Sequence, residues 1–404
     1  MLKRLALNTA VQTLGRAIMV GVALLTTGVL TRKLGVVGYG NFLLIGSLGV
    51  FFDTLADFGT TIMGVREASK EESETGKRKV WSSVAVLRLQ MALISFSLAV
   101  TVTFLWPDFA TIRMEAILAW VMLLFTSVAG SLGIVWQTRL RMEKKVVAEV
   151  MFPGLFLVAL WLYKGEISLL WVFGIYLLAR VVSLSYAWYV ARGSISFKER
   201  DKELIKKILR LSWPMGVYLL IFSAYDRAAD SLMIRRMLGE NEVAWYGLAY
   251  KIYAVLVQPA YFLVSGVFPT LSAKKETKKV FELTASLLLI AVGLVISVSW
   301  ILAPWIIKVL AGEGYEMTAV VLRILVFALL FSYLGHLVGF TLIAKEGQEE
   351  MSKLSLLVLV FNLVANLIFI PVFGLKGAAG VTVATEALSL CFMSWKLRQK
   401  TNLK

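Results

Sequence analysis

Apolar runs of about twenty residues recur along the chain and constrain its fold more than any other feature. A helix of that length just crosses the roughly 30 Å of hydrocarbon in a membrane. The chain has 404 residues and is only 17% charged, whereas a soluble domain has about 25%. We therefore expect an all-α integral membrane protein with twelve transmembrane helices, near 8–31, 39–64, 81–105, 112–137, 147–163, 167–191, 212–234, 244–270, 281–304, 316–343, 353–373 and 377–397.

Basic residues alternate in number between successive connections. The termini and the even connections carry 28 Lys and Arg, and the odd connections carry eight. Because cytoplasmic loops are enriched in Lys and Arg, this bias predicts a multi-pass plasma (inner) membrane protein with both termini in the cytoplasm. It also accounts for most of the net charge of +16, which then favours anionic membrane lipids as partners and not nucleic acid.

Several chemistries lack the residues they need. The chain has one cysteine, Cys391, and one histidine, His336, which excludes an internal disulfide and argues against a zinc centre. No GxxxxGK[ST] phosphate loop occurs. We expect no enzyme, no metal site and no cofactor. Transport would draw on the substrate's own concentration difference or on a gradient of H⁺ or Na⁺.

The chain contains an internal repeat. The segment "RKLGVVGYG" at 32–40 ends the first apolar run and opens the second, and "RRMLGENEVAWYG" at 235–247 does the same for the seventh and eighth. Six spans per copy is an even number, so both copies face the same way. The repeat predicts two six-helix halves, 1–191 and 212–404, related by an axis along the membrane normal, as in many secondary transporters.

The longest polar connection, 192–211, has an amphipathic end. Within "RDKELIKKILRLSWP" at 200–214, four apolar residues share one helical face, with Lys and Arg opposite: Leu204, Ile205, Ile208 and Leu209. This pattern predicts a helix that lies in the cytoplasmic interface and ties the halves together. The alternative is a cytoplasmic extension of the seventh span.

Five segments carry a resemblance to a known family. They are "TRKLGVVGYGNF" at 31–42, "DFGTTIMGVRE" at 57–67, "LGENEVAWYGLAYKI" at 238–252, "SGVFPTLS" at 265–272 and "FNLVANLIFIPVFGLKGAAGVTVATE" at 361–386. Over nearly its whole length the chain resembles the oligosaccharide-lipid flippases (Wzx or polysaccharide-transporter type) of the multidrug/oligosaccharidyl-lipid/polysaccharide (MOP) superfamily.

The resemblance implies a fold and a function. The fold would be MATE-like, with the two pseudo-symmetric halves around a central cavity. The function would be translocation of a polyprenyl-(di)phosphate-linked oligosaccharide from the cytoplasmic to the outer leaflet by alternating access. A glycan polymerase or glycosyltransferases would be its partners.

Three other functions stay open. A drug or organic-cation antiporter would use the same fold with an aromatic, net acidic lining. A lipid II flippase is disfavoured, because that branch usually has fourteen spans. A non-transporting membrane scaffold is a third alternative, against which the repeat and the buried charges argue.

Eleven charged residues and one histidine lie inside the predicted spans. A charge in hydrocarbon costs several kcal/mol unless it is paired or faces water, so each is a functional candidate. The residues expected to form a substrate-binding cationic cavity are Arg16, Arg88, Arg180, Lys251 and Arg323. The ion-pair or coupling candidates are Asp53, Asp57, Asp226, Arg227, Asp230, Glu386 and His336.

We expect some of the acids to pair locally, with Asp230 bonded to Arg227 at i,i+3. Arg16, Arg88 and Arg180 would then stay unpaired, and their guanidinium groups suit phosphate oxygens. The alternative is that these charges are interhelical ion pairs that fix the bundle and contact no ligand.

Overall fold

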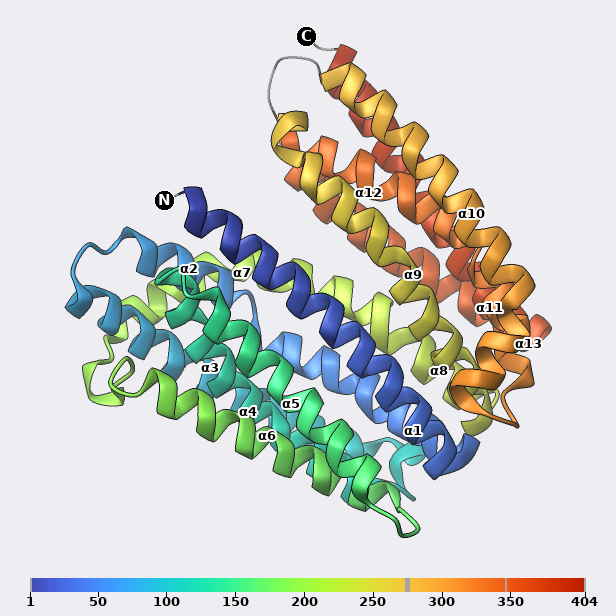
Figure 1. Cartoon of the computed structure of the whole chain (residues 1–404), viewed down its shortest axis with the longest axis horizontal. Coiled ribbons are helices and arrows are strands. Elements are labelled where there is room, and N and C mark those ends of the chain that lie inside the picture. The colour runs from blue at the N-terminus through green and yellow to red at the C-terminus, as the bar shows by residue number, and fades with distance from the viewer. Residues whose placement is uncertain (1, 273–276, 346, 403–404) are drawn as a thin grey trace. The chain divides into compact units, whose positions relative to one another are not determined.

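The computed structural model describes residues 2–272, 277–345 and 347–402, and no strand occurs in these ranges (Figure 1). The chain divides into two compact units, Met1–Ser223 and Ala224–Lys404. The helices of unit 1 are α1 Leu2–Asp57, α2 Thr60–Lys70, α3 Glu74–Leu105, α4 Arg113–Thr138, α5 Met142–Leu162, α6 Leu169–Ala191 and α7 Lys202–Ser223. Unit 2 holds a π-helical turn η3 Ala224–Ala229 and the helices α8 Asp230–Met237, α9 Glu240–Ser272, α10 Thr277–Ala311, α11 Glu316–Leu325, α12 Ala328–Ala344 and α13 Gln348–Asn402.

Each unit is a helical bundle with its own packing. In unit 1, α1 and α3–α6 run side by side, α2 packs against α3 and α4, and α7 packs against α1, α2 and α3 (Figure 1). In unit 2, α12 packs against α9, α10 and α13, and α11 packs against the same three helices. The all-helical fold predicted from the apolar runs is confirmed.

The surfaces of the bundles are apolar, as a membrane requires. On α10, Ile290, Leu294 and Ile301 are 73%, 64% and 65% exposed. A water-soluble protein rarely shows such a continuous apolar face, whereas lipid tails solvate it well. Small and polar residues fill helix contacts instead, as Ser95 does when it donates to the Phe52 carbonyl at 2.6 Å.

Two helices are too long to be single spans. α1 has 56 residues and α13 has 55, about 84 Å at 1.5 Å per residue. Each is interrupted by a glycine with a positive φ, Gly35 (φ 66°, ψ −173°) and Gly374 (φ 58°, ψ −139°). Non-glycine residues scarcely reach this region of backbone conformation. Each break separates two of the apolar runs seen in the sequence.

By length and hydropathy, eight helices among the described residues can cross a membrane, or nine when α11 and α12, bent by 43°, count as one broken span. Because α1 and α13 each hold two apolar runs, twelve spans stays a prediction. Gly239, the expected counterpart of Gly35 in the repeat, lies between α8 and α9 and also has a positive φ of 139°. The symmetry of the two halves stays a prediction as well.

The boundary between the compact units differs from the predicted one. We expected a linker at 192–211 and a second half that begins at 212. The structure instead has α7 continuous from Lys202 to Ser223. Its apolar face packs on a buried cluster from α2, α3 and α4 that includes Ala68, Trp81 and Ile134. The amphipathic stretch is therefore part of one continuous helix that belongs to unit 1, and both the interfacial helix and the seventh span stay predictions.

The break at Gly374 yields a stability prediction. An added Cβ would meet no neighbour within 4 Å at either Gly374 or Gly380 of α13, and only Gly374 has a positive φ. Gly374→Ala should therefore lower the free energy of unfolding by roughly 1–3 kcal/mol, through backbone strain alone. Gly380→Ala, the matched control, should raise it by about 0.5–1 kcal/mol. Denaturant titration in detergent measures both, and equal effects would contradict the assigned break.

Candidate functional site

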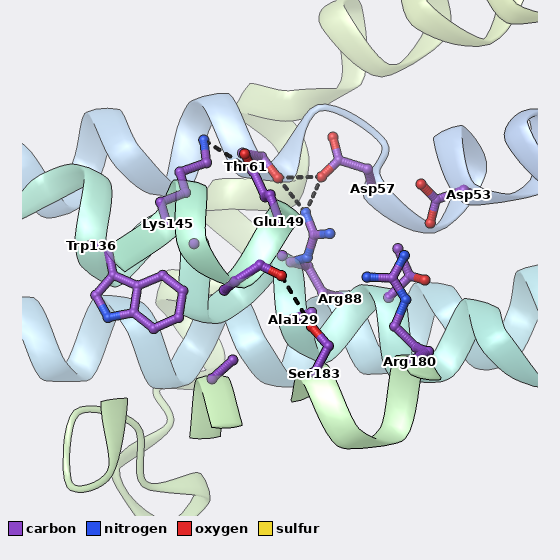
Figure 2. Close-up of a pocket in the computed structure, with 15 residues that line it drawn as sticks. Asp53, Asp57, Thr61, Arg88, Ala129, Trp136, Lys145, Glu149, Arg180 and Ser183 are labelled. Atoms are coloured by element: carbon purple, nitrogen blue, oxygen red, sulfur yellow. Dashed lines mark hydrogen bonds and ion pairs between the residues drawn. The ribbon is translucent and has the colours of Figure 1, made fainter. Parts of the chain in front are cut away.

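The charged residues of unit 1 converge on one pocket of about 310 Å³. Figure 2 shows its lining side chains, which come from the six helices α1 to α6. They are Asp53 and Asp57 of α1, Thr61 of α2, Arg88 of α3, Thr126, Ala129, Gly130, Gly133 and Trp136 of α4, Lys145, Ala148 and Glu149 of α5, and Arg180, Ser183 and Ala187 of α6. Asp53 and Asp57, two of the ion-pair or coupling candidates, both line this pocket.

Arg88 is fixed by a buried polar network. Its side chain is 6% exposed, and it forms an ion pair with Asp57 across the α1–α3 contact (Figure 2). It also donates to Thr61 Oγ1 and, through Nε, to the Ser127 carbonyl at 3.1 Å. The Thr61 hydroxyl in turn donates to Asp57 Oδ1 at 2.5 Å. We expected Arg88 to be unpaired, and this expectation is wrong.

A strained break in the backbone places Asp57 at the pocket. α1 ends there because Phe58 and Gly59 both take positive φ values, 43° and 73°, and Phe58 is a bulky residue that rarely does so. Tertiary contacts hold it in this conformation. The Phe58 ring lies where a side chain on Gly216 of α7 would be, and it meets the Trp213 ring edge-on at 5.4 Å.

Arg180 is a cation that forms no ion pair with the described residues. Its guanidinium carbon lies 3.7 Å from the centre of the Phe152 ring, a stacking contact that arginine favours. Its Nε is buried and has no hydrogen-bond partner among the described residues. Of the three arginines expected to stay unpaired, Arg180 is the one that lines the pocket and forms no ion pair with the described residues.

Asp53 is the anionic counterpart of Arg180. The two charges lie close enough to interact electrostatically, and Figure 2 shows them together at one end of the pocket. Within the described part of the chain, no ion pair joins Asp53 to Arg180, and Asp53 has no hydrogen-bond partner. Both groups therefore offer polar atoms to the pocket.

Two lining charges were missed from the sequence. Lys145 and Glu149 of α5 lie one helical turn apart, 3.9 Å between their charged atoms, and Lys145 also donates to Gln137 at 3.2 Å. The sequence analysis assigned Lys145 to a cytoplasmic connection, although its i,i+4 spacing from Glu149 could have marked a shared face. With them the pocket has three cations and three acids.

The other cationic candidates lie elsewhere. Arg16 is exposed on α1 and does not line the pocket. Lys251 is half-buried on α9 of unit 2. Arg323 donates from Nε to the Trp300 carbonyl at 3.0 Å and stacks over the Trp300 ring. The side chains of two coupling candidates, Asp226 and Arg227, lie outside the described residues, so the expected pairing of Asp230 with Arg227 stays a prediction.

Unit 2 holds a second polar cluster, around Asp230. Asp230 is 8% exposed and accepts from the Tyr246 hydroxyl at 2.7 Å and from Asn366 Nδ2 at 2.8 Å. Asn366 also donates to Asn362 Oδ1 at 3.2 Å, and Tyr246 shares a 2.8 Å bond with Thr382. The Asn366 side-chain oxygen is buried without a partner in the described residues.

Glu386 and His336 meet at Ser332. The Ser332 hydroxyl donates to Glu386 at 2.9 Å and shares a 2.6 Å bond with Tyr253, and His336 Nδ1 lies 2.7 Å from the Ser332 carbonyl. Tyr250 stacks between Tyr246 and Tyr253, at 6.1 and 5.5 Å. A row of tyrosines on α9 thus connects the surroundings of the two carboxylates.

The fold matches those of two solved membrane transporters. It matches a multidrug resistance MATE family transporter of the MOP superfamily, solved facing inward, with a TM-score of 0.77 and 16% identity over 94% of each chain. It also matches the lipid II flippase MurJ in an inward closed conformation, with a TM-score of 0.74 and 14% identity over 97% of this chain and 87% of the other. Both of these proteins are transporters and not enzymes, and the fold of this chain is the MOP fold.

The family follows from the sequence. The model of the polysaccharide biosynthesis protein family matches residues 5–275, and the chain belongs to that family.

Two relatives match part of the chain. An uncharacterized membrane protein of Methanocaldococcus jannaschii is 26% identical over 55% of this chain and 46% of its own length. The probable low-salt glycan biosynthesis flippase of Haloferax volcanii is 22% identical over 57% of this chain and 50% of its own. The chain therefore spans about half the length of the curated relatives it matches.

The two arginines of the pocket should differ in their effect on stability. Arg88→Ala strands the Asp57 carboxylate, and the free energy of unfolding should fall by up to about 3 kcal/mol, the low end for a buried pair because Asp57 is 24% exposed. Adding Asp57→Ala should recover most of that loss. Arg180→Ala breaks no ion pair or hydrogen bond among the described residues and should change the free energy by about 1 kcal/mol at most.

Denaturant titration of the purified variants in detergent makes this comparison. A loss for Arg180→Ala as large as that for Arg88→Ala, or no recovery in the double variant, would contradict the assigned pairing.

Proposed function

We propose that this protein is a flippase that moves a polyprenyl-(di)phosphate-linked oligosaccharide from the cytoplasmic to the outer leaflet by alternating access, for polysaccharide or glycan biosynthesis. Membership of the polysaccharide biosynthesis protein family supports the pathway class. The Haloferax volcanii relative, described as a glycan biosynthesis flippase, and MurJ, a lipid II flippase, support the reaction.

The observation that carries the proposal is the state of Arg180. A guanidinium with no ion pair, in a pocket within a membrane bundle, is costly unless an anion reaches it. Its forked donors match phosphate oxygens, and charge-assisted bonds of this kind are the strongest available to a side chain. The (di)phosphate would bind here, while the polyprenyl tail stays in lipid between helices.

Location and partners follow from the same proposal. Multiple apolar helices make this a multi-pass membrane protein, and we place it in the plasma (inner) membrane with both termini in the cytoplasm. Reporters fused near residues 75 and 165 should then read opposite sides. The substrate would come from glycosyltransferases and pass to a glycan polymerase, which are the partners that we propose.

A second candidate function is export of drugs or organic cations. It is favoured by the likeness to the MATE transporter and by the Asp53 carboxylate, which could attract a cation. The pocket has as many cations as acids, which makes it a poorer cation site than a net acidic one. Unchanged drug sensitivity in a deletion strain that has lost surface glycan would dismiss this candidate.

Export of glycan tests the flippase function. Arg180→Ala should abolish export in a complemented deletion strain while membrane levels stay near those of the wild type. Arg180→Lys should restore part of it, because lysine keeps the charge but loses the forked geometry. Surface glycan staining with an immunoblot of the membrane fraction measures both quantities. Wild-type export by Arg180→Ala would overturn the proposal.

We propose further that the Asp230 cluster couples transport to a cation, H⁺ or Na⁺. Its oxygens come from a carboxylate, amides and hydroxyls, the hard ligands that such cations prefer, and one amide oxygen is buried without a partner in the described residues.

If the cation is Na⁺, adding it at constant ionic strength should raise the melting temperature of the wild type but not of Asp230→Asn. If it is H⁺, only transport measured against pH should respond to that substitution. No effect of Asp230→Asn on either measurement would rule out this coupling site. Glu350→Gln, which removes a carboxylate at the start of α13, is the control.

A further inference from the structure

The pocket of unit 1 presents two opposite charges that do not satisfy each other. The guanidinium of Arg180 is held against Phe152, and Asp53 projects from α1 near it (Figure 2). Neither has a hydrogen bond to the described protein, whereas the neighbouring pair Arg88–Asp57 is closed. Charged groups withdrawn from bulk water need partners, so the space between Asp53 and Arg180 is suited to a ligand that meets both.

We propose that Asp53 is the specificity-determining residue of this pocket: it accepts hydrogen bonds from sugar hydroxyls of a ligand whose phosphate is bound by Arg180. The inference rests on the proposed flippase function and adds to it a residue that recognises the sugar. The pocket then selects a sugar phosphate over phosphate alone.

The chemistry of a carboxylate supports this role. An ionised carboxylate only accepts hydrogen bonds, with two oxygens, and it would repel a phosphate placed directly against it. A sugar phosphate resolves the conflict, because it carries an anion and several hydroxyl donors a few bonds apart. One small ligand can therefore satisfy Arg180 and Asp53 at once.

The volume of the pocket limits the size of the ligand that it can bind. Its volume of about 310 Å³ is near the lower end of the roughly 300–1,000 Å³ found for ligand sites. This accommodates one sugar with its phosphate and not a longer glycan. Trp136 lies at the opposite end of the pocket from Asp53 and Arg180 (Figure 2), where an apolar ring face can bound the sugar.

The test is binding of soluble probes to the purified full chain in detergent, by isothermal titration calorimetry. The probes are α-D-glucose 1-phosphate, inorganic phosphate and phosphoethanolamine. Wild type should bind the sugar phosphate about ten- to a hundredfold more tightly than phosphate, the range of one or two charge-assisted hydrogen bonds. Phosphoethanolamine, which offers Asp53 an ammonium in place of hydroxyls, tests whether the pocket selects a cationic group over a sugar.

The variants separate the two roles. Asp53→Asn should bind both phosphates with similar affinity, and Arg180→Ala should bind neither. Asp53→Ser is a second variant of the same position, and Asp108→Asn, in the loop before α4, is the control that keeps the preference. A wild-type melting temperature for each variant shows that it is folded; Asp53 has no hydrogen bond whose loss would unfold the protein.

Two results would overturn the inference without touching the flippase proposal. The first is that both Asp53 variants still prefer the sugar phosphate to inorganic phosphate as strongly as the wild type does. The second is that the wild type binds phosphoethanolamine more tightly than the sugar phosphate. In each case, phosphate binding would still depend on Arg180. Failure of the wild type to bind either phosphate, or binding that is indifferent to Arg180→Ala, would instead count against phosphate recognition by this pocket, and thus against both.

Discussion

The ion pair between Arg88 and Asp57 is the interaction on which the pocket of unit 1 depends. It joins the end of α1 to α3 across 31 residues of sequence, in a region where an unpaired charge would cost several kcal/mol. Asp57 reaches Arg88 because the backbone breaks at Phe58 and Gly59. That break is held in turn by the packing of Phe58 against Gly216 of α7. Electrostatics and backbone geometry thus support each other.

Because Arg88 and Asp57 pair with each other, the charges of the pocket that are available to a ligand are those of Arg180 and Asp53. Arg180 and Asp53 are placed by aromatic packing and by helix register, not by each other. Within this one pocket, the Arg88–Asp57 ion pair stabilises the fold. In our proposal, Arg180 and Asp53 bind the ligand. In unit 2, Asp230 and Glu386 accept hydrogen bonds from tyrosine, asparagine and serine side chains.

Much of the fold could be predicted from the sequence, because apolar runs and charge clusters are local signals. The runs fall on helices, and Asp53 and Asp57, four residues apart, share a pocket. The pairing of Arg88 with Asp57 could not be predicted, since it depends on which faces of α1 and α3 meet. Arg16 looked equivalent to Arg88 in sequence but is exposed on α1. Lys145 was assigned to a connection because it lies near the start of α5, and its i,i+4 spacing from Glu149 marks a shared helix face but not a pocket.

The boundary between the units shows the same limit. The repeat places the start of the second half at 212, yet the apolar face of α7 packs on α2, α3 and α4 and keeps α7 with unit 1. A sequence repeat shows which helices are similar to one another. The packing of side chains determines which helices form one compact unit. Only contacts between distant residues carry the second kind of information.

The most direct test of the account is an experimental structure of the protein with a polyprenyl-phosphate-linked sugar bound. The account predicts phosphate oxygens within hydrogen-bond distance of the Arg180 guanidinium, a sugar hydroxyl on Asp53, and an intact Arg88–Asp57 pair. A ligand phosphate bound away from this pocket, with Arg180 turned to an acidic partner of the protein, would contradict it.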